Sequence, residues 1–338
     1  MLYYYAMSVT LFGKEYTAQT NSIVHQASHK IITIPKEIGH LTLLQKLYLD
    51  NNKITIIPKE IGQLTSLLTI SLSNNKLIII PEELFQLTPL QYINFNNNQI
   101  AVLPKNISKL INLKELRIEN NQITEIPKEL GKLIKLEYIF LGSNNIVIIP
   151  KELNQLVSLV GLNLSYNKIT TIPKELFQLP LLHTLILSTN KIIEIPKELG
   201  ELTTLLFLDF GDNQITRIPQ EICQLILLKS LILTNNYLST LPSELCQISS
   251  LLFLFVNNNH MTTIPHEFYN SSTLKYFQTY GNFFNSGLYC PTTFADIQAY
   301  QTKLTKSIKA IQSIKIQFWL CRKWIDKCEP DYNLSIEL

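Results

Sequence analysis

The sequence predicts an α/β repeat solenoid, in which the chain coils repeatedly and stacks each coil on the one before it. Three residue types recur together at an interval of 23 residues over eleven cycles. Such a period is typical of solenoids, because each unit buries its apolar side chains only against its neighbours. The leucine series runs from Leu44 to Leu274. The proline series consists of Pro35, Pro58, Pro81, Pro104, Pro127, Pro150, Pro173, Pro196, Pro219, Pro242 and Pro265. The asparagine series consists of Asn52, Asn75, Asn98, Asn121, Asn144, Asn167, Asn190, Asn213, Asn236, Asn259 and Asn282.

One unit, residues 44–66, shows how a coil is built. Alternating apolar and polar residues from Lys46 to Leu49 predict a short, half-buried strand. Pro58 then opens a segment on the opposite side of the coil, where a proline suits the first position of a helix. The segment is too short for a stable isolated helix, so we expect a 3₁₀ turn or one to two helical turns. We expect Gly62 to close this segment with a positive φ.

The asparagine of each unit follows the predicted strand, at the point where the chain turns away from the sheet. Buried backbone groups at this turn need hydrogen-bond partners, and a carboxamide offers both donors and acceptors. We therefore expect the eleven asparagines from Asn52 to Asn282 to form a structural ladder rather than a functional site.

The pattern LxxLxLxxNxIxxIPxEIxxL resembles the leucine-rich repeat, and within that family the 23-residue class of intracellular Ras-group repeat proteins. The resemblance covers residues 21–290. It implies a right-handed horseshoe with a parallel β-sheet on the concave face and short 3₁₀ or helical segments on the convex face. It also implies a scaffold that binds a partner on the concave face, in intracellular signalling, and that has no catalytic activity.

The pattern weakens at both ends of the chain. In the first coil, Gln26 takes an apolar position and His29 takes the asparagine position, and after Asn285 the repeat is lost. Apolar residues at helical spacing from Leu304 to Ile325 predict a helix in the tail. The expected segments are an N-terminal cap (1–20), a solenoid of one degenerate and eleven regular coils (21–290) and a C-terminal helical cap (291–338).

The predicted C-terminal helix is also basic. Between Lys303 and Cys328 there are seven lysines or arginines and one acidic residue. A basic amphipathic helix can bind an anionic membrane or an acidic partner, so a peripheral membrane adaptor is an alternative function. We favour a simple cap, because the open end of a solenoid must be covered.

Outward strand positions on the concave face vary between coils, and we expect a partner to bind there. The coil of residues 113–135 carries a charged cluster, and the C-terminal coils carry aromatic residues that we expect to form one solvent-exposed patch. Exposed aromatics and arginines are typical of interfaces, although strand propensity alone also favours aromatic residues. The predicted partner-binding residues are Glu115, Arg117, Glu119, Tyr138, Phe140, Phe207, Asp209, Ile232, Phe253, Phe255, Tyr276 and Tyr280.

Composition and motif content argue against other classes of function. The formal net charge of +3 gives no basis for general nucleic-acid binding. Sparse cysteines, the lack of a signal-peptide pattern and the lack of a long apolar run predict a cytoplasmic protein. Motifs for phosphate binding, serine nucleophiles and zinc are missing from the sequence, so we expect no enzyme activity, no cofactor and no metal. We expect a monomer that binds another protein.

A distant alternative is a cysteine-dependent effector enzyme that uses Cys321 or Cys328 in the tail. Only 53 residues follow Asn285, which is too short for such a catalytic domain. Cys223 and Cys246 occupy equivalent positions in adjacent coils, and we expect them to be ordinary free cysteines.

Overall fold

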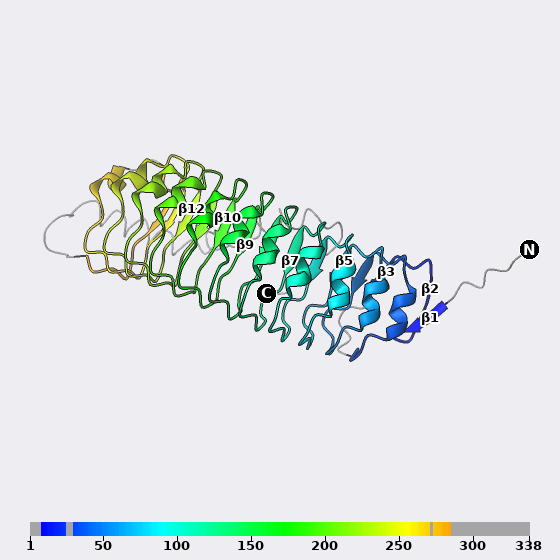
Figure 1. Ribbon diagram of the computed structural model, residues 1–338. Coiled ribbons are helices and arrows are strands. Elements are labelled where there is room, and N and C mark those ends of the chain that lie inside the picture. Colours follow the sequence, from blue (N-terminus) through cyan, green and yellow to red (C-terminus); the bar gives the residue numbers. More distant parts are fainter. Residues whose placement is uncertain (1–7, 25–29, 271–272, 285–338) are drawn as a thin grey trace, which may run out of the picture. The chain divides into compact units, whose positions relative to one another are not determined.

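The computed structural model describes residues 8–24, 30–270 and 273–284, and within them a solenoid built on a 12-stranded parallel sheet. The strands stack in chain order, each paired with the next (Figure 1). They are β3 (Ser22–Val24), β4 (Lys46–Tyr48), β5 (Thr69–Ser71), β6 (Tyr92–Asn94), β7 (Glu115–Arg117), β8 (Tyr138–Phe140), β9 (Gly161–Asn163), β10 (Thr184–Ile186), β11 (Phe207–Asp209), β12 (Ser230–Ile232), β13 (Phe253–Phe255) and β14 (Tyr276–Gln278). This architecture confirms the predicted leucine-rich-repeat horseshoe.

Short 3₁₀ helices of five residues form the other layer of the solenoid. They are η1 (Lys36–His40), η2 (Lys59–Gln63), η3 (Glu82–Gln86), η4 (Lys105–Lys109), η5 (Lys128–Lys132), η6 (Lys151–Gln155), η7 (Lys174–Gln178), η8 (Lys197–Glu201), η9 (Gln220–Gln224), η10 (Ser243–Gln247) and η11 (His266–Asn270). A single turn of this kind is the expected outcome, because one coil leaves no room for a longer helix.

The core between the two layers is a continuous stack of leucines and isoleucines. In the second coil, the seven apolar positions of the repeat are all buried. They are Leu44, Leu47, Leu49, Ile54, Ile57, Ile61 and Leu64. Equivalent residues of successive coils join one hydrophobic cluster that runs through the solenoid. Each coil is therefore stable only because it stacks on its neighbours.

Two expectations about the convex segment were wrong in detail. Pro58 precedes η2 rather than beginning it: its backbone is extended, and its carbonyl accepts a 3.0 Å hydrogen bond from the Ile61 N–H. Gly62 lies inside η2 and has no positive φ. A Cβ on Gly62 would come within 2.9 Å of the Glu83 carbonyl oxygen, so the glycine allows close approach of the next coil.

Each turn that leaves the sheet contains a residue with a left-handed φ, immediately before the asparagine of the repeat. Most of these residues are Asn or Asp, which tolerate this conformation better than other L-residues do. They are Asn51, Asn74, Asn97, Asn120, Ser143, Tyr166, Thr189, Asp212, Asn235, Asn258 and Gly281. This second series was not predicted from the sequence, although the repeated Asn-Asn pairs indicate it.

The repeat asparagines tie neighbouring coils together through their side chains. Asn144 shows the pattern: its Nδ2 donates to the Leu141 carbonyl of its own coil at 3.1 Å and to the Ile118 carbonyl of the preceding coil at 2.9 Å. Its Oδ1 accepts from the Ile123 N–H at 3.0 Å. One buried carboxamide therefore satisfies backbone groups that no strand or helix can pair.

The N-terminal segment is an antiparallel hairpin of β1 (Ser8–Leu11) and β2 (Lys14–Thr17), separate from the large sheet. Val9 and Leu11 are buried and belong to the same hydrophobic cluster as the solenoid. The hairpin thus extends the core beyond the first coil.

The first coil departs from the 23-residue period. Its strand pairs Ile23 with Leu47, an offset of 24 residues. The Asn52 Oδ1 accepts from the Ile31 N–H with the ordinary spacing of the repeat, so the chain from Ile23 to Ile31 is one residue longer than its counterpart from Leu47 to Ile54. Gln26 and His29 lie outside the described residues, and so does the predicted C-terminal cap at 291–338.

Candidate protein-binding face

The concave face is formed by outward side chains of the parallel strands, stacked in register. Arg117 of β7 lies beside Phe140 of β8, and Ile232 of β12 lies beside Phe255 of β13. Strictly parallel pairing brings residues 23 positions apart into direct contact, because neighbouring strands lie about 4.8 Å apart. Both residue clusters expected from the sequence occur on this face, but their exposure differs.

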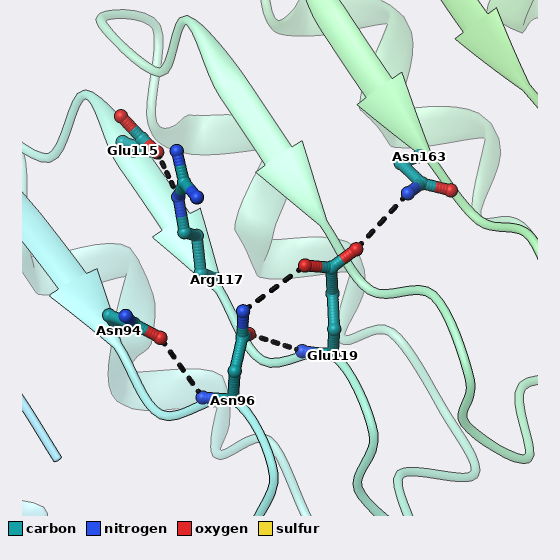
Figure 2. A network of polar contacts seen from close by, with 6 residues as sticks. All are labelled: Asn94, Asn96, Glu115, Arg117, Glu119 and Asn163. Carbon is teal, nitrogen blue, oxygen red and sulfur yellow. Dashed lines mark hydrogen bonds and ion pairs between the residues drawn. The ribbon is translucent and has the colours of Figure 1, made fainter. Parts of the chain in front are cut away.

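The central cluster is organised around Arg117. Its Nε donates to the Glu115 carboxylate, and its guanidinium lies 4.8 Å from the centroid of the Phe140 ring and 5.9 Å from that of Tyr92 (Figure 2 shows the ion pair). Burial disfavours the guanidinium charge, but the nearby Glu115, Tyr92 and Glu119 outweigh burial and raise the pKa of Arg117. Arg117 is therefore held as a cation in one position, sandwiched between two aromatic side chains.

Glu119 is held by two asparagines from different coils (Figure 2). Its carboxylate accepts from the Asn96 Nδ2 at 3.1 Å and from the Asn163 Nδ2 at 3.1 Å. The Asn96 Oδ1 in turn accepts from the Glu119 N–H at 2.7 Å. Because this network links three coils, the acidic group is fixed on the rigid sheet.

Tyr138 and Phe140 complete the central cluster, and both are half-buried. Their rings are nearly parallel, with centroids 6.3 Å apart. The neighbouring strand carries Gly161 beside Tyr138, where a Cβ would come within 2.9 Å of the tyrosine Cδ1. Glycine at this position therefore leaves space for the tyrosine ring to lie across the next strand.

The C-terminal cluster corrects the expectation of a solvent-exposed aromatic patch. Phe253 and Phe255 are each only 8% exposed. The Phe253 ring stacks on Tyr276 of the next strand, with centroids 4.9 Å apart and planes 9° apart. Phe207, Ile232 and Tyr276 are half-buried, and Tyr280 is 57% exposed. Most of the aromatic surface in these coils is thus used for packing.

Asp209 is buried and bonds to its own coil, which the sequence did not predict. Its Oδ1 accepts from the Gly211 N–H at 2.8 Å. Burial raises the pKa of the Asp209 carboxyl, although hydrogen bonds from Gly211 and the Ser188 side chain oppose this and Asp212 adds to it. Asp209 therefore has a structural role in its turn and presents little surface to a partner.

The described residues contain two free, half-buried cysteines, Cys223 and Cys246. Burial and nearby Glu244 raise the pKa of the Cys223 thiol to about 11, which disfavours the nucleophilic thiolate. Among the described residues there is no grouping of three or more side chains suited to hold a metal ion. Cys321 and Cys328 lie outside the described part of the chain.

In the same described part of the chain, every helix is too short or too polar to cross a membrane. The basic segment from Lys303 to Cys328, which suggested a membrane adaptor, lies beyond it.

Comparison with known proteins identifies the repeat. The family profile described as "Leucine rich repeat" matches residues 42–100 and 111–169, and a profile for two copies of the repeat matches residues 88–128. No curated protein sequence is significantly similar to the chain. A leucine-rich-repeat protein of Leptospira interrogans is 37% identical, with a TM-score of 0.69; the match covers 81% of this chain and 74% of that chain.

Two plant receptors are also similar, over smaller shares of their own length. The peptide hormone receptor RGFR1, solved in complex with RGF2, is 30% identical with a TM-score of 0.66, and the match covers 79% of this chain and 48% of the receptor. The GASSHO1/SCHENGEN3 ectodomain from Arabidopsis thaliana is 27% identical with a TM-score of 0.69, and the match covers 78% of this chain and 36% of that chain. On its repeat, its fold and its identity to the Leptospira protein, the chain belongs to the leucine-rich-repeat family.

Proposed function

We propose that the protein is a non-enzymatic scaffold that binds another protein on the concave face of its sheet, in intracellular signalling. The observation that carries this proposal is the central cluster around Arg117, where aromatic and charged side chains are contiguous and partly accessible. Arginine and tyrosine are the residue types that contribute most to binding energy in protein interfaces. The two plant receptors support the proposal, because each was solved with a bound ligand.

The rigidity of the central cluster also favours recognition. Arg117, Glu119 and Tyr138 are each held by contacts within the sheet before any partner arrives. Side chains that are already ordered lose little conformational entropy on binding, so more of the contact energy contributes to affinity. We infer that this cluster is the centre of the interface, with the outward residues of neighbouring strands around it.

The proposal is tested by capturing binding partners with the intact chain and with a variant of the central cluster. The double substitution Tyr138→Ala, Phe140→Ala removes aromatic surface and keeps the core of each coil. We expect at least a tenfold loss of affinity, equivalent to about 1.4 kcal/mol, for any partner that binds the concave face. Affinity is measured by calorimetry once the captured protein has been identified and purified.

A matched control lies on the convex face. The double substitution Lys151→Ala, Lys174→Ala removes two exposed side chains of η6 and η7. We expect it to leave affinity unchanged. If partners bind the concave-face variant as tightly as the wild type, the central cluster is not the interface and the proposal fails.

A further inference from the structure

A second surface lies on the flank of the solenoid, between each sheet-leaving turn and the following 3₁₀ helix. At two adjacent positions there, large aliphatic residues point into solvent, one each in the second and fourth coils and two each in the third and sixth. Their side chains are 44–72% exposed. We call this surface the flank patch; it consists of Ile56, Ile78, Ile79, Val102, Val147 and Ile148.

The repeat itself does not require apolar residues at these positions. In the seventh to eleventh coils the same two positions carry threonine, serine or charged residues, with Ile193 the one large aliphatic. Glu194 and Arg217 occupy the position that Ile79 occupies in the third coil. In the fifth coil, within the patch, Glu125 occupies the position equivalent to Ile79. Because all these coils have the same fold, coil formation does not need aliphatic residues at these positions.

The area of the flank patch is large for a monomer. Exposed aliphatic side chains offer on the order of 100 Å² each, so six offer roughly 600 Å², at the upper end of the largest apolar patch on typical monomers. A standard protein interface buries about 800 Å² from each partner. The aliphatic stems of Lys53 and Lys76, which border the patch and are exposed, extend the apolar area towards that value.

We propose that the flank patch is a dimer interface occupied by the same patch of a second copy of this chain. The side chains of the patch repeat at the coil spacing of about 4.8 Å. A second copy presents the same spacing, so the rows of the two patches can interdigitate on either side of the gap at Thr124 and Glu125. Two-fold interfaces pair one surface with itself in this way.

The charges beside the patch favour one arrangement of the two copies. In the second and third coils, Lys53 and Lys76 border the patch on the side of the turn, whereas the helix side carries three acidic groups and one basic group, namely Glu60, Glu82, Glu83 and Lys59. If the two-fold axis runs from coil to coil along the patch, it exchanges the two long borders of the patch. The lysines on the turn side of one copy then face the net acidic helix side of the other. The alternative, an axis across the patch, would set like charges together and cost affinity.

The oligomeric state of the intact chain tests the proposal. We expect sedimentation equilibrium at rising micromolar concentrations to show a dimer of the 38.9 kDa chain. The substitution Ile79→Glu places a charge at the centre of the patch, and Glu125 and Glu194 show that the coil accepts glutamate at this position. We expect this variant to dissociate at least a hundredfold more readily, with an unchanged circular dichroism spectrum.

Two further variants make the test specific. Thr171→Glu changes the same position in the seventh coil, outside the patch, and should leave the dimer unchanged. Glu125→Ile fills the gap in the patch and should tighten the dimer about tenfold. A wild type that stays monomeric at the highest soluble concentration would overturn the proposal, as would a dimer that Ile79→Glu does not weaken. Ile134 lies on the opposite flank of the solenoid. If Ile134→Glu abolished the dimer and Ile79→Glu did not, the interface would lie on that opposite flank and the proposal would be wrong.

Discussion

The central and C-terminal clusters of the concave face occupy the same strand positions but serve different purposes. Phe140 of β8 and Phe255 of β13 are equivalent residues in coils five apart. Phe140 is half-buried beneath the Arg117 guanidinium, whereas Phe255 is buried. The position of a residue in the repeat thus determines the face on which its side chain lies. The residues beside it in adjacent coils determine how much of that side chain is exposed.

The neighbours differ in size and polarity. The central cluster is bordered by Gly161 and contains the charged groups of Glu115, Arg117 and Glu119, which are held by contacts within the sheet. In the C-terminal cluster, Phe253 instead stacks on Tyr276, so apolar surface is covered within the chain itself. This difference fits our proposal that the central cluster binds a partner, whereas the C-terminal cluster stabilises the fold.

The largest expected effect is on stability and distinguishes the two clusters directly. Phe255→Ala should lower the free energy of unfolding by about 3 kcal/mol, because truncating a buried phenylalanine removes apolar burial and leaves a cavity. Phe140→Ala should cost about 1 kcal/mol, because its ring is only partly buried. Urea denaturation followed by circular dichroism compares the two variants. Equal losses would show that the two clusters do not differ in this way.

The same comparison changes how binding should be tested. A variant with both Phe253 and Phe255 replaced by alanine would lose stability as well as surface. Lost binding in that variant would therefore not identify an interface. The half-buried side chains of the central cluster avoid this problem.

The next effect concerns the ion pair of the central cluster. Arg117→Ala removes the ion pair with the buried Glu115 carboxylate and should cost about 2 kcal/mol. Replacing both residues with alanine should cost less than the sum of the single substitutions, with a coupling of about 1–2 kcal/mol. Denaturation of the four proteins of this cycle measures the coupling. Additive losses would mean that the pair contributes nothing beyond its separate side chains.

The smallest effect is a pH dependence at Asp209, between the two clusters. Burial raises the pKa of this carboxyl in the folded state, so the folded protein binds its proton more tightly than the unfolded chain does. Stability of the wild type should therefore rise, relative to Asp209→Asn, as pH falls through the raised pKa. The rise should be complete below about 3.9, the ordinary pKa of aspartate.

Thermal melts of both proteins from neutral to acidic pH measure this difference. Asp209→Asn keeps an oxygen that can accept from the Gly211 N–H, so it isolates the charge. A wild type that loses stability relative to the variant on acidification would contradict the direction of the shift.

The sequence by itself determined the coil, the sheet and the strand register of this protein. Core residues 23 positions apart have the same surroundings in every regular coil, so the pattern of one unit predicts the core of all of them. The pairing of Phe253 with Tyr276 follows from the period alone. The left-handed turn residues could also have been read from the sequence, because Asn and Asp recur there.

Only the tertiary structure decided how much of each outward side chain is accessible. The space for Tyr138 over Gly161 and the stacking of Phe253 on Tyr276 depend on irregular residues in the next coil, whereas Asp209 bonds to Gly211 in its own coil. The 23-residue period did not predict the extra residue in the first coil, because the chain has no second coil of that kind for comparison. Because the coils repeat, the fold can be predicted from the sequence. A binding surface is formed by the outward residues that differ between coils, and its shape depends on how these side chains pack against one another.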